Sequence, residues 1–223
     1  GYLQKHHPMN FGFQKFVGFK SGNVDYQSHR NRYGDVDWWD GLEMKNMPGY
    51  TTTLLTTLSE DYIKENKDKP FCLYIAHAAP HSPMQGPNEK AIRTEATLEG
   101  DKNSDRPNKE IYKDMVEELD WSVGRILETL KKYKLDKNTF VVFFSDNGPV
   151  INNGGSTGGY RGAKGAPWEG GHRVPGICYM PGTVKGGTMC KQTVMSFDLF
   201  PTMLDMANIH YDDSKKKLDG ASL

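Results

Sequence analysis

The apolar positions of the chain fall into patterns typical of helices and of strands. Apolar residues recur at helical spacing over residues 51–66 and 109–133, which predicts an amphipathic helix in each range. The longer range has apolar positions at Met115, Leu119, Val123, Ile126 and Leu130. A closing helix is expected over residues 196–209, beginning around Asp198, and Pro201 is compatible with it because proline is tolerated in the first turn of a helix.

Three short apolar runs, residues 71–76, 140–144 and 174–179, predict strands. The run Phe-Val-Val-Phe-Phe at 140–144 contains only β-branched and aromatic residues, which is typical of a strand buried on both faces. Such strands belong to parallel sheets that are covered by helices. Since helices and strands alternate, the sequence predicts an α/β fold.

Two stretches, residues 1–48 and 84–108, show no sustained periodicity. We expect irregular structure over a core for the first and a surface excursion for the second. Trp38 and Trp39 could stack on a sugar, but packing within a core or a loop explains the pair equally well.

Composition narrows the classes of partner. The 223 residues include 28 Lys plus Arg and 28 Asp plus Glu, so net charge gives no reason to expect a nucleic acid or an anionic membrane. No run approaches the roughly 18 apolar residues of a membrane span, so no transmembrane segment is expected. Cys72, Cys178 and Cys190 form no C-x-x-C pair, which argues against a zinc ribbon or a disulfide scaffold. Because Cys72 and Cys178 lie in apolar runs, we expect both thiols to be buried.

Polar residues follow the run at 140–144. Asp146 and Asn147 offer hard oxygen ligands, and Gly148 lets the backbone turn sharply beside them. Ligands of parallel sheets collect where the strands end, so Asp146 and Asn147 are candidate ligands of a divalent metal. An Asp-Asn-Gly turn without a ligand is the alternative.

Two histidines follow the run at 71–76 in the same way. His77 and His81 lie in a loop whose backbone is fixed by Pro80 and Pro83. Imidazole titrates near neutral pH and can give a proton to a leaving oxygen, so both are candidate acids. Structural or surface histidines are the alternative.

A glycine-rich segment lies downstream. Residues 151–159 are expected to form a mobile loop, and they lack the spacing of a nucleotide-binding loop. Lys164 follows in a glycine-lined stretch where its ammonium group could approach an anion, although an exposed lysine is the default explanation. Arg173 is expected to have a structural role, tying the loop at Glu169.

Ser-Asp-Asn-Gly at 145–148 and Arg-Gly-x-Lys-(x)4-Glu-Gly-Gly-x-Arg-Val-Pro at 161–175 occur together on either side of this loop. In this combination the chain resembles the type I sulfatases, the arylsulfatase and N-acetylgalactosamine-6-sulfatase group of the alkaline-phosphatase superfamily. The resemblance implies an alkaline-phosphatase-like, mostly parallel or mixed sheet flanked by helices on both faces, present here as a partial domain.

The resemblance also implies roles for four residues. Asp146 and Asn147 match ligands of one Ca²⁺, and Lys164 matches the lysine that holds the sulfate oxygens. His81 matches the His-x-Pro histidine that lies against the sulfate ester, so His81 and Lys164 are the expected catalytic and substrate-binding residues. His77 matches no position that the family requires.

The nucleophile of the family does not occur in this sequence. Sulfatases of this type use a Cys or Ser in Cys/Ser-x-Pro-x-Arg, oxidised to formylglycine, and none of the three cysteines has a proline two residues later. The upstream Asp-Asp metal ligands are also missing. We therefore expect residues 1–223 to be part of one sulfatase catalytic domain whose N-terminal part is absent, and to be inactive alone.

The parent protein is accordingly expected to be a calcium- and formylglycine-dependent sulfuric ester hydrolase, acting on a sulfated small molecule or glycan. The resemblance implies a periplasmic, secreted or lysosomal location. Two alternatives are a metal-dependent phosphatase or phosphomutase of the same superfamily and a non-catalytic carbohydrate-binding module.

Overall fold

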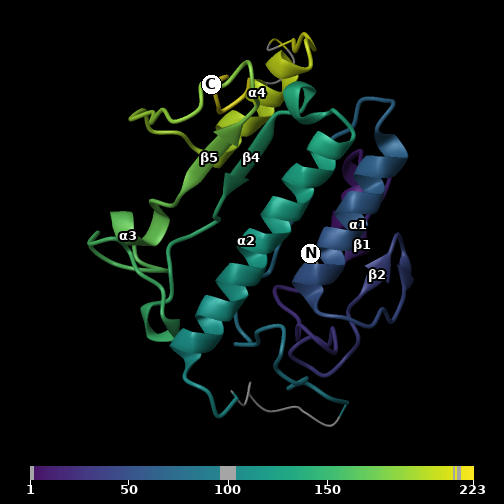
Figure 1. Ribbon diagram of the computed structural model, residues 1–223, viewed down its shortest axis with the longest axis vertical. Helices are drawn as coiled ribbons and strands as arrows, with labels where there is room; N and C mark the ends of the chain where they lie inside the picture. The colour runs from purple at the N-terminus through teal and green to yellow at the C-terminus, as the bar shows by residue number, and fades with distance from the viewer. Residues whose placement is uncertain (1–2, 96–103, 213, 215–216) are drawn as a thin grey trace. The chain divides into compact units, whose positions relative to one another are not determined.

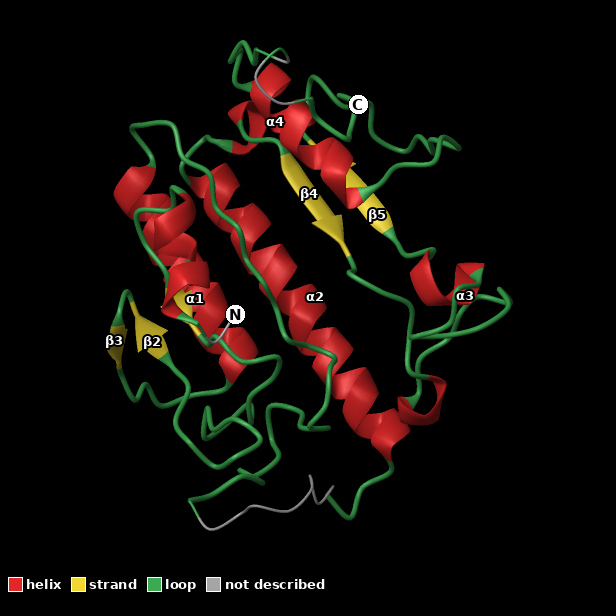
Figure 2. Cartoon of the chain, turned by 180° about the vertical axis from the view of Figure 1, so that it is seen from behind, coloured by secondary structure: helices red, strands yellow, loops and turns green. Residues whose placement is uncertain are grey.

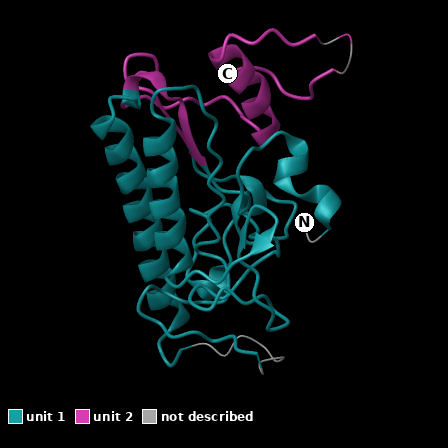
Figure 3. Ribbon diagram, turned by 90° about the vertical axis from the view of Figure 1, so that its right-hand side faces the viewer, with its two compact units in different colours: residues 1–136, 144–176 teal, residues 137–143, 177–223 magenta. Residues whose placement is uncertain are grey.

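The computed structural model describes residues 3–95, 104–212, 214 and 217–223. The chain divides into two compact units, which Figure 3 distinguishes by colour. The first comprises residues 1–136 and 144–176, and the second comprises residues 137–143 and 177–223. The expectation for residues 96–103, the middle of the polar stretch, lies outside the described residues.

Two long helices dominate the first unit and lie side by side (Figure 1). They are α1 (Thr51–Asn66) and α2 (Asn108–Lys132), so both helices predicted from periodicity are confirmed. The contact between them is partly polar, because Thr56 Oγ1 of α1 donates a hydrogen bond of 2.6 Å to Ser122 Oγ of α2. Small hydroxyl side chains allow the two backbones to approach, and the hydroxyl groups of Thr56 and Ser122 are paired with each other.

The core of the first unit forms where loops pack against the N-terminal half of α2. Its fully buried members Tyr26, Ile111 and Met115 share one cluster with Met84 from the stretch expected at the surface. Gln85 and Arg93 of the same stretch are also buried. The expected surface excursion is therefore wrong for residues 84–86 and for Arg93, while residues 88, 90, 91, 94 and 95 are exposed as expected. Hydrogen bonds from this segment to residues 25–28 bury it although it has no apolar periodicity.

A small antiparallel sheet completes the first unit (Figure 2). Its strands, in spatial order, are β1 (Val17–Gly18), β2 (Trp39–Asp40) and β3 (Glu43–Met44). Trp38 is fully buried against the ring of His29, and the Nε1–H of Trp39 donates to Asp37 Oδ1 at 2.7 Å. Packing, one of the two explanations of the pair, holds for Trp38, while Trp39 is half-buried.

The second unit contains α4 (Leu199–Met206) and most of a two-stranded sheet of β4 (Val141–Phe144) and β5 (Gly176–Tyr179). The two strands and the closing helix, with Pro201 in its first turn, are confirmed. Burial of β4 on both faces is wrong. Its side chains are half-buried or exposed, because in the described part of the chain only β5 pairs with it.

Several short helical turns complete the described structure. A short helix, α3 (Glu169–His172), follows Trp168. The 3₁₀ turns are Gln4–His6, Pro8–Phe11, Asp136–Asn138, Ile151–Asn153 and Ser196–Asp198. Within the described ranges, none of the helices combines the length and the apolar character needed to cross a membrane.

The strand predicted at residues 71–76 is wrong. Half-buried and exposed side chains alternate along it, as in a strand, but its backbone pairs with no strand among the described residues. A strand needs a hydrogen-bonded neighbour, which apolar content alone does not supply. Cys72 in this run and Cys178 in β5 are both exposed, so the prediction of buried thiols is wrong as well. Neither run is covered on both faces.

Candidate functional site

Two candidate metal ligands follow the end of β4. Asp146 is exposed, and its carboxylate makes no hydrogen bond or ion pair within the described ranges. Asn147 is half-buried, and its Nδ2 donates to the carbonyl oxygen of Gly148 at 2.9 Å. The hydrogen bond of Asn147 uses its amide nitrogen and leaves its side-chain oxygen available as a ligand. The Asp146 carboxylate is available as well, because it has no partner among the described residues.

These two residues suit a hard divalent cation but form only part of a site. Carboxylate and carboxamide oxygens are the donors that Ca²⁺ and Mg²⁺ prefer, and Ca²⁺ takes six to eight oxygen ligands. Among the described residues, no group of three or more His, Cys, Asp or Glu side chains is close enough to hold an ion. The donor types therefore fit calcium, while further ligands must come from elsewhere.

The loop that carries Lys164 is fastened to the same segment by two backbone hydrogen bonds. Gly148 N–H donates to the carbonyl of Gly171 at 2.7 Å, and Lys164 N–H donates to the carbonyl of Pro149 at 3.0 Å. Lys164 and the candidate metal ligands therefore belong to one loop cluster within the first unit.

Glycine is required where these segments meet. A Cβ atom on Gly148 would lie 2.0 Å from the carbonyl oxygen of Gly170, and one on Gly171 would lie 2.1 Å from that of Ala166. Both clashes are with backbone atoms, which cannot rotate away. The absence of side chains at Gly148 and Gly171 is what lets the Lys164 loop approach the residues after Asn147.

Replacing Gly148 with alanine in the full-length protein should therefore lower the free energy of unfolding by about 3 kcal/mol, through overpacking against fixed backbone. Gly176→Ala is the matched control, since a Cβ there meets no atom within 4 Å. Chemical denaturation measures both changes. Equal stability of the two variants would show that the close approach is not formed.

The charge of Lys164 is uncompensated in this loop. The side chain is exposed and has no polar partner among the residues described. Glu169, the carboxylate nearest in sequence, is engaged by Arg173, whose Nη1 lies 3.0 Å from Glu169 Oε2. This pairing agrees with the structural role expected for Arg173. Lys164 is consequently free to attract an anion.

His81 lies in the same unit, on the loop after residues 71–76, and its ring is exposed. Its Nδ1 lies 2.9 Å from the carbonyl oxygen of Ser82. A carbonyl oxygen can only accept, so this contact requires a proton on Nδ1 and leaves Nε2 as the nitrogen available to a substrate. No hydrogen bond or ion pair among the described residues joins His81 to Lys164 or Asp146.

His77 is the weaker of the two candidate acids. Burial lowers the pKa of His77 to about 4, so its ring is neutral near pH 7 and cannot act there as a cationic acid. Its Nε2 lies 3.3 Å from Ser122 Oγ, and its buried Nδ1 has no partner in the described part of the chain. The sequence signal, a histidine after an apolar run, could not distinguish this buried ring from the exposed His81.

The buried ring of His77 should make stability depend on pH. Because its folded pKa lies below the unfolded value of about 6.5, the unfolded chain binds the extra proton, and stability falls as pH decreases from about 6.5 to about 4. Between pH 7 and pH 5 the loss should be about 2 kcal/mol. Chemical denaturation of His77→Gln should lack this component, whereas His172→Gln, at an exposed position, should keep it.

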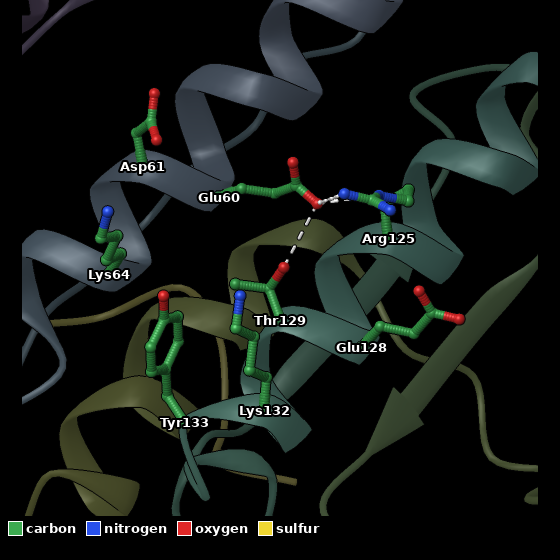
Figure 4. Close-up of a pocket in the computed structure, with 8 residues that line it drawn as sticks. All are labelled: Glu60, Asp61, Lys64, Arg125, Glu128, Thr129, Lys132 and Tyr133. Atoms are coloured by element: carbon green, nitrogen blue, oxygen red, sulfur yellow. Dashed lines mark hydrogen bonds and ion pairs between the residues drawn. The ribbon is translucent and has the colours of Figure 1, made fainter.

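A cavity of about 330 Å³ lies apart from these residues, between α1 and the C-terminal part of α2 (Figure 4). One ion pair crosses it, since Glu60 Oε1 accepts hydrogen bonds from Arg125 at 2.9 Å and from Thr129 at 3.3 Å. Neither the candidate metal ligands nor His81 and Lys164 line it.

A family model described as Sulfatase matches residues 2–209. The chain belongs to the sulfatase family. The resemblance stated from the two motifs is confirmed.

Named relatives extend this assignment. This sulfatase chain is 33% identical over 180 residues to steryl-sulfatase of Rattus norvegicus, and the aligned region covers 77% of this chain and 29% of the relative. It is 32% identical over 221 residues to arylsulfatase J of Mus musculus, and the aligned region covers 96% of this chain and 36% of the relative. It is 31% identical over 240 residues to N-acetylgalactosamine-6-sulfatase of Canis lupus familiaris, and the aligned region covers 100% of this chain and 43% of the relative. The chain thus spans less than half the length of these relatives.

Solved structures support the α/β class. The crystal structure of Ps i-CgsB superposes with a TM-score of 0.84 at 28% identity, covering 99% of this sulfatase chain and 51% of that one. The same protein has been solved in complex with k-i-k-neocarrahexaose, with a TM-score of 0.83 at 27% identity. A large sheet with helices on both faces stays an expectation for the complete domain.

Proposed function

We propose that the protein to which this chain belongs hydrolyses sulfate esters of carbohydrates. The observation that carries the proposal is the loop cluster in which the backbone N–H of Lys164 is hydrogen-bonded to the carbonyl of Pro149, in the segment that follows Asp146 and Asn147, while the Lys164 ammonium group has no polar partner among the described residues. A lysine that can attract an anion, on a loop joined to the segment with two hard oxygen ligands, suits a reaction at a sulfate group.

Each residue has a distinct role in the proposed reaction. Lys164 neutralises charge on the non-bridging sulfate oxygens. His81 acts as an imidazolium with a proton on each ring nitrogen, and it gives the Nε2 proton to the leaving alcohol while Nδ1–H stays on the carbonyl oxygen of Ser82. Asp146 and Asn147 supply two of the oxygen ligands of one Ca²⁺, which when bound adds positive charge next to the sulfate. The attacking oxygen is assigned to a formylglycine outside these residues, and the rest of the catalytic domain is the partner that completes the site.

The substrate class rests on relatives with informative names. One relative is named for N-acetylgalactosamine 6-sulfate, and the complex of Ps i-CgsB contains neocarrahexaose, so a sulfated glycan is the proposed substrate. Steryl-sulfatase, among the relatives, is named for a substrate that is not a sugar. We place the protein in the periplasm, outside the cell or in the lysosome, as expected from the family resemblance.

The test uses the full-length protein, matured with its formylglycine-generating system. We expect it to hydrolyse 4-nitrophenyl sulfate and a sulfated galactose oligosaccharide, to contain calcium, and to leave 4-nitrophenyl phosphate nearly untouched. Preferential cleavage of the phosphate ester with two bound zinc ions would instead identify a phosphatase. Binding of the oligosaccharide without turnover would identify a carbohydrate-binding module.

A further inference from the structure

The loop of His81 rests on a buried tyrosine. Tyr26 is fully buried, and its hydroxyl group donates a hydrogen bond of 2.9 Å to the backbone carbonyl of His81. The contact bridges 55 residues of sequence, so it is a tertiary restraint on the backbone from which the imidazole projects. Since His81 is itself exposed, this restraint comes from beneath the ring.

The position of Tyr26 is fixed on all sides. Its N–H donates to Gln85 Oε1 at 2.9 Å, and its carbonyl accepts from both N–H and Oγ1 of Thr51, at 2.8 and 3.1 Å. The ring stacks on that of Tyr50, with centroids 5.3 Å apart. Because the Tyr26 side chain is held in place, its hydroxyl group can restrain the His81 carbonyl and does not simply move with the His81 backbone.

Asp25 fastens the segment that follows the His81 loop to the turn that carries Tyr26. Its Oδ1 accepts from the N–H groups of the two residues after Tyr26, while its Oδ2 accepts from Ile92 and Arg93 N–H at 2.7 and 2.8 Å and from Gln85 Nε2 at 3.2 Å. Burial raises the pKa of this carboxyl, but the four backbone donors outweigh burial and hold the pKa below its usual value. The carboxylate is thus charged and fully bonded at neutral pH.

We propose that Tyr26, held by Asp25 and Gln85, is a positioning residue that aims the imidazole of His81 at the leaving oxygen. The inference rests on the proposed function, in which His81 protonates the leaving alcohol. A hydrogen bond of this kind contributes roughly 1 kcal/mol, which corresponds to several-fold to tenfold in rate. Its loss lets the His81 backbone move, and proton transfer is sensitive to small displacements.

The test compares Tyr26→Phe with Tyr50→Phe in the full-length enzyme. Each variant loses one phenolic hydroxyl from the same stacked pair, but the hydroxyl of Tyr50 donates to the carbonyl of Gln85, at 2.7 Å, and not to His81. Turnover is measured with 4-nitrophenyl sulfate, whose leaving group departs without a proton, and with phenyl sulfate, whose leaving group needs one. The ratio of the two rates does not depend on how much of a preparation is folded.

In Tyr26→Phe we expect kcat for phenyl sulfate to fall about tenfold while kcat for 4-nitrophenyl sulfate changes less than about twofold. In Tyr50→Phe the ratio should match the wild type. In a His81→Gln background, Tyr26→Phe should have no further effect on the ratio, because the two changes remove one function.

Two outcomes overturn the inference. An unchanged ratio in Tyr26→Phe would leave the hydrogen bond a structural role alone, as would the same change of ratio in Tyr50→Phe. Both results require an active parent enzyme, which separates them from failure of the proposed function. A wild-type protein that hydrolyses neither ester rejects the proposed function and this inference together.

Discussion

Lys164→Ala should lower kcat of the full-length enzyme by about two to three orders of magnitude, the usual cost of removing one preorganised charge from a reacting anion. The ammonium has no competing partner in the described part of the chain, so nothing else there shares its charge. Lys164→Arg should recover only part of the loss, because a planar guanidinium does not reproduce a compact ammonium. Steady-state kinetics with 4-nitrophenyl sulfate measures both.

Lys185, exposed and in the second unit, supplies the control. Lys185→Ala should retain wild-type kcat and KM. If Lys164→Ala raised KM and left kcat unchanged, the lysine would bind substrate and transition state equally, and the role in stabilising developing charge would be rejected.

Asp146→Ala should abolish retention of the metal and, with it, turnover. The Asp146 carboxylate is the stronger of the two oxygen donors after the end of β4. Without it, the only ligand that remains from this pair is the neutral side-chain oxygen of Asn147. The metal content of the purified full-length protein, measured by mass spectrometry after dialysis against a chelator, should fall from about one calcium per chain to nearly zero.

Asp120→Ala is the matched change, since Asp120 is an exposed carboxylate of α2 and is not a candidate ligand. It should keep the full metal content. An Asp146→Ala protein with unaltered calcium would remove Asp146 from the ligand set and with it half of the metal site assigned to this chain.

Helices could be predicted from this sequence more fully than strands. The limits of α1 and α2 follow from apolar periodicity, because each helix makes its own hydrogen bonds. The limits of a strand depend on a neighbour. Residues 141–144 pair with β5 and form a strand, whereas the equally apolar residues 71–76 pair with none of the described strands. Cys72 lies in the segment without a pairing strand, whereas Cys178 is exposed although its strand β5 pairs with β4, because pairing along the strand edge does not cover the face of a strand.

The part of the candidate site that could be predicted consists of residues in short motifs, whose side-chain types and spacing indicate their chemistry. Asp146, Asn147 and Lys164 were found from two short motifs, and the structure brings their segments together. The supports of His81 were not found, because Tyr26 and Gln85 lie in stretches without periodicity and act through contacts 55 and 59 residues apart in sequence. Only three-dimensional proximity reveals such contacts.

The segment at residues 71–76, which pairs with none of the described strands, also bears on how the chain behaves when it is produced by itself. Six residues of high β-propensity, without charge or proline, form the kind of window that stacks between identical chains into insoluble assemblies. The alternation of exposed and half-buried side chains shows which positions can be changed with the least effect on packing. Cys72 and Tyr74 are exposed, whereas Leu73 and Ile75 are half-buried. A lysine at either outward position would act as a gatekeeper against self-association during refolding, and it would leave the inward side chains unchanged.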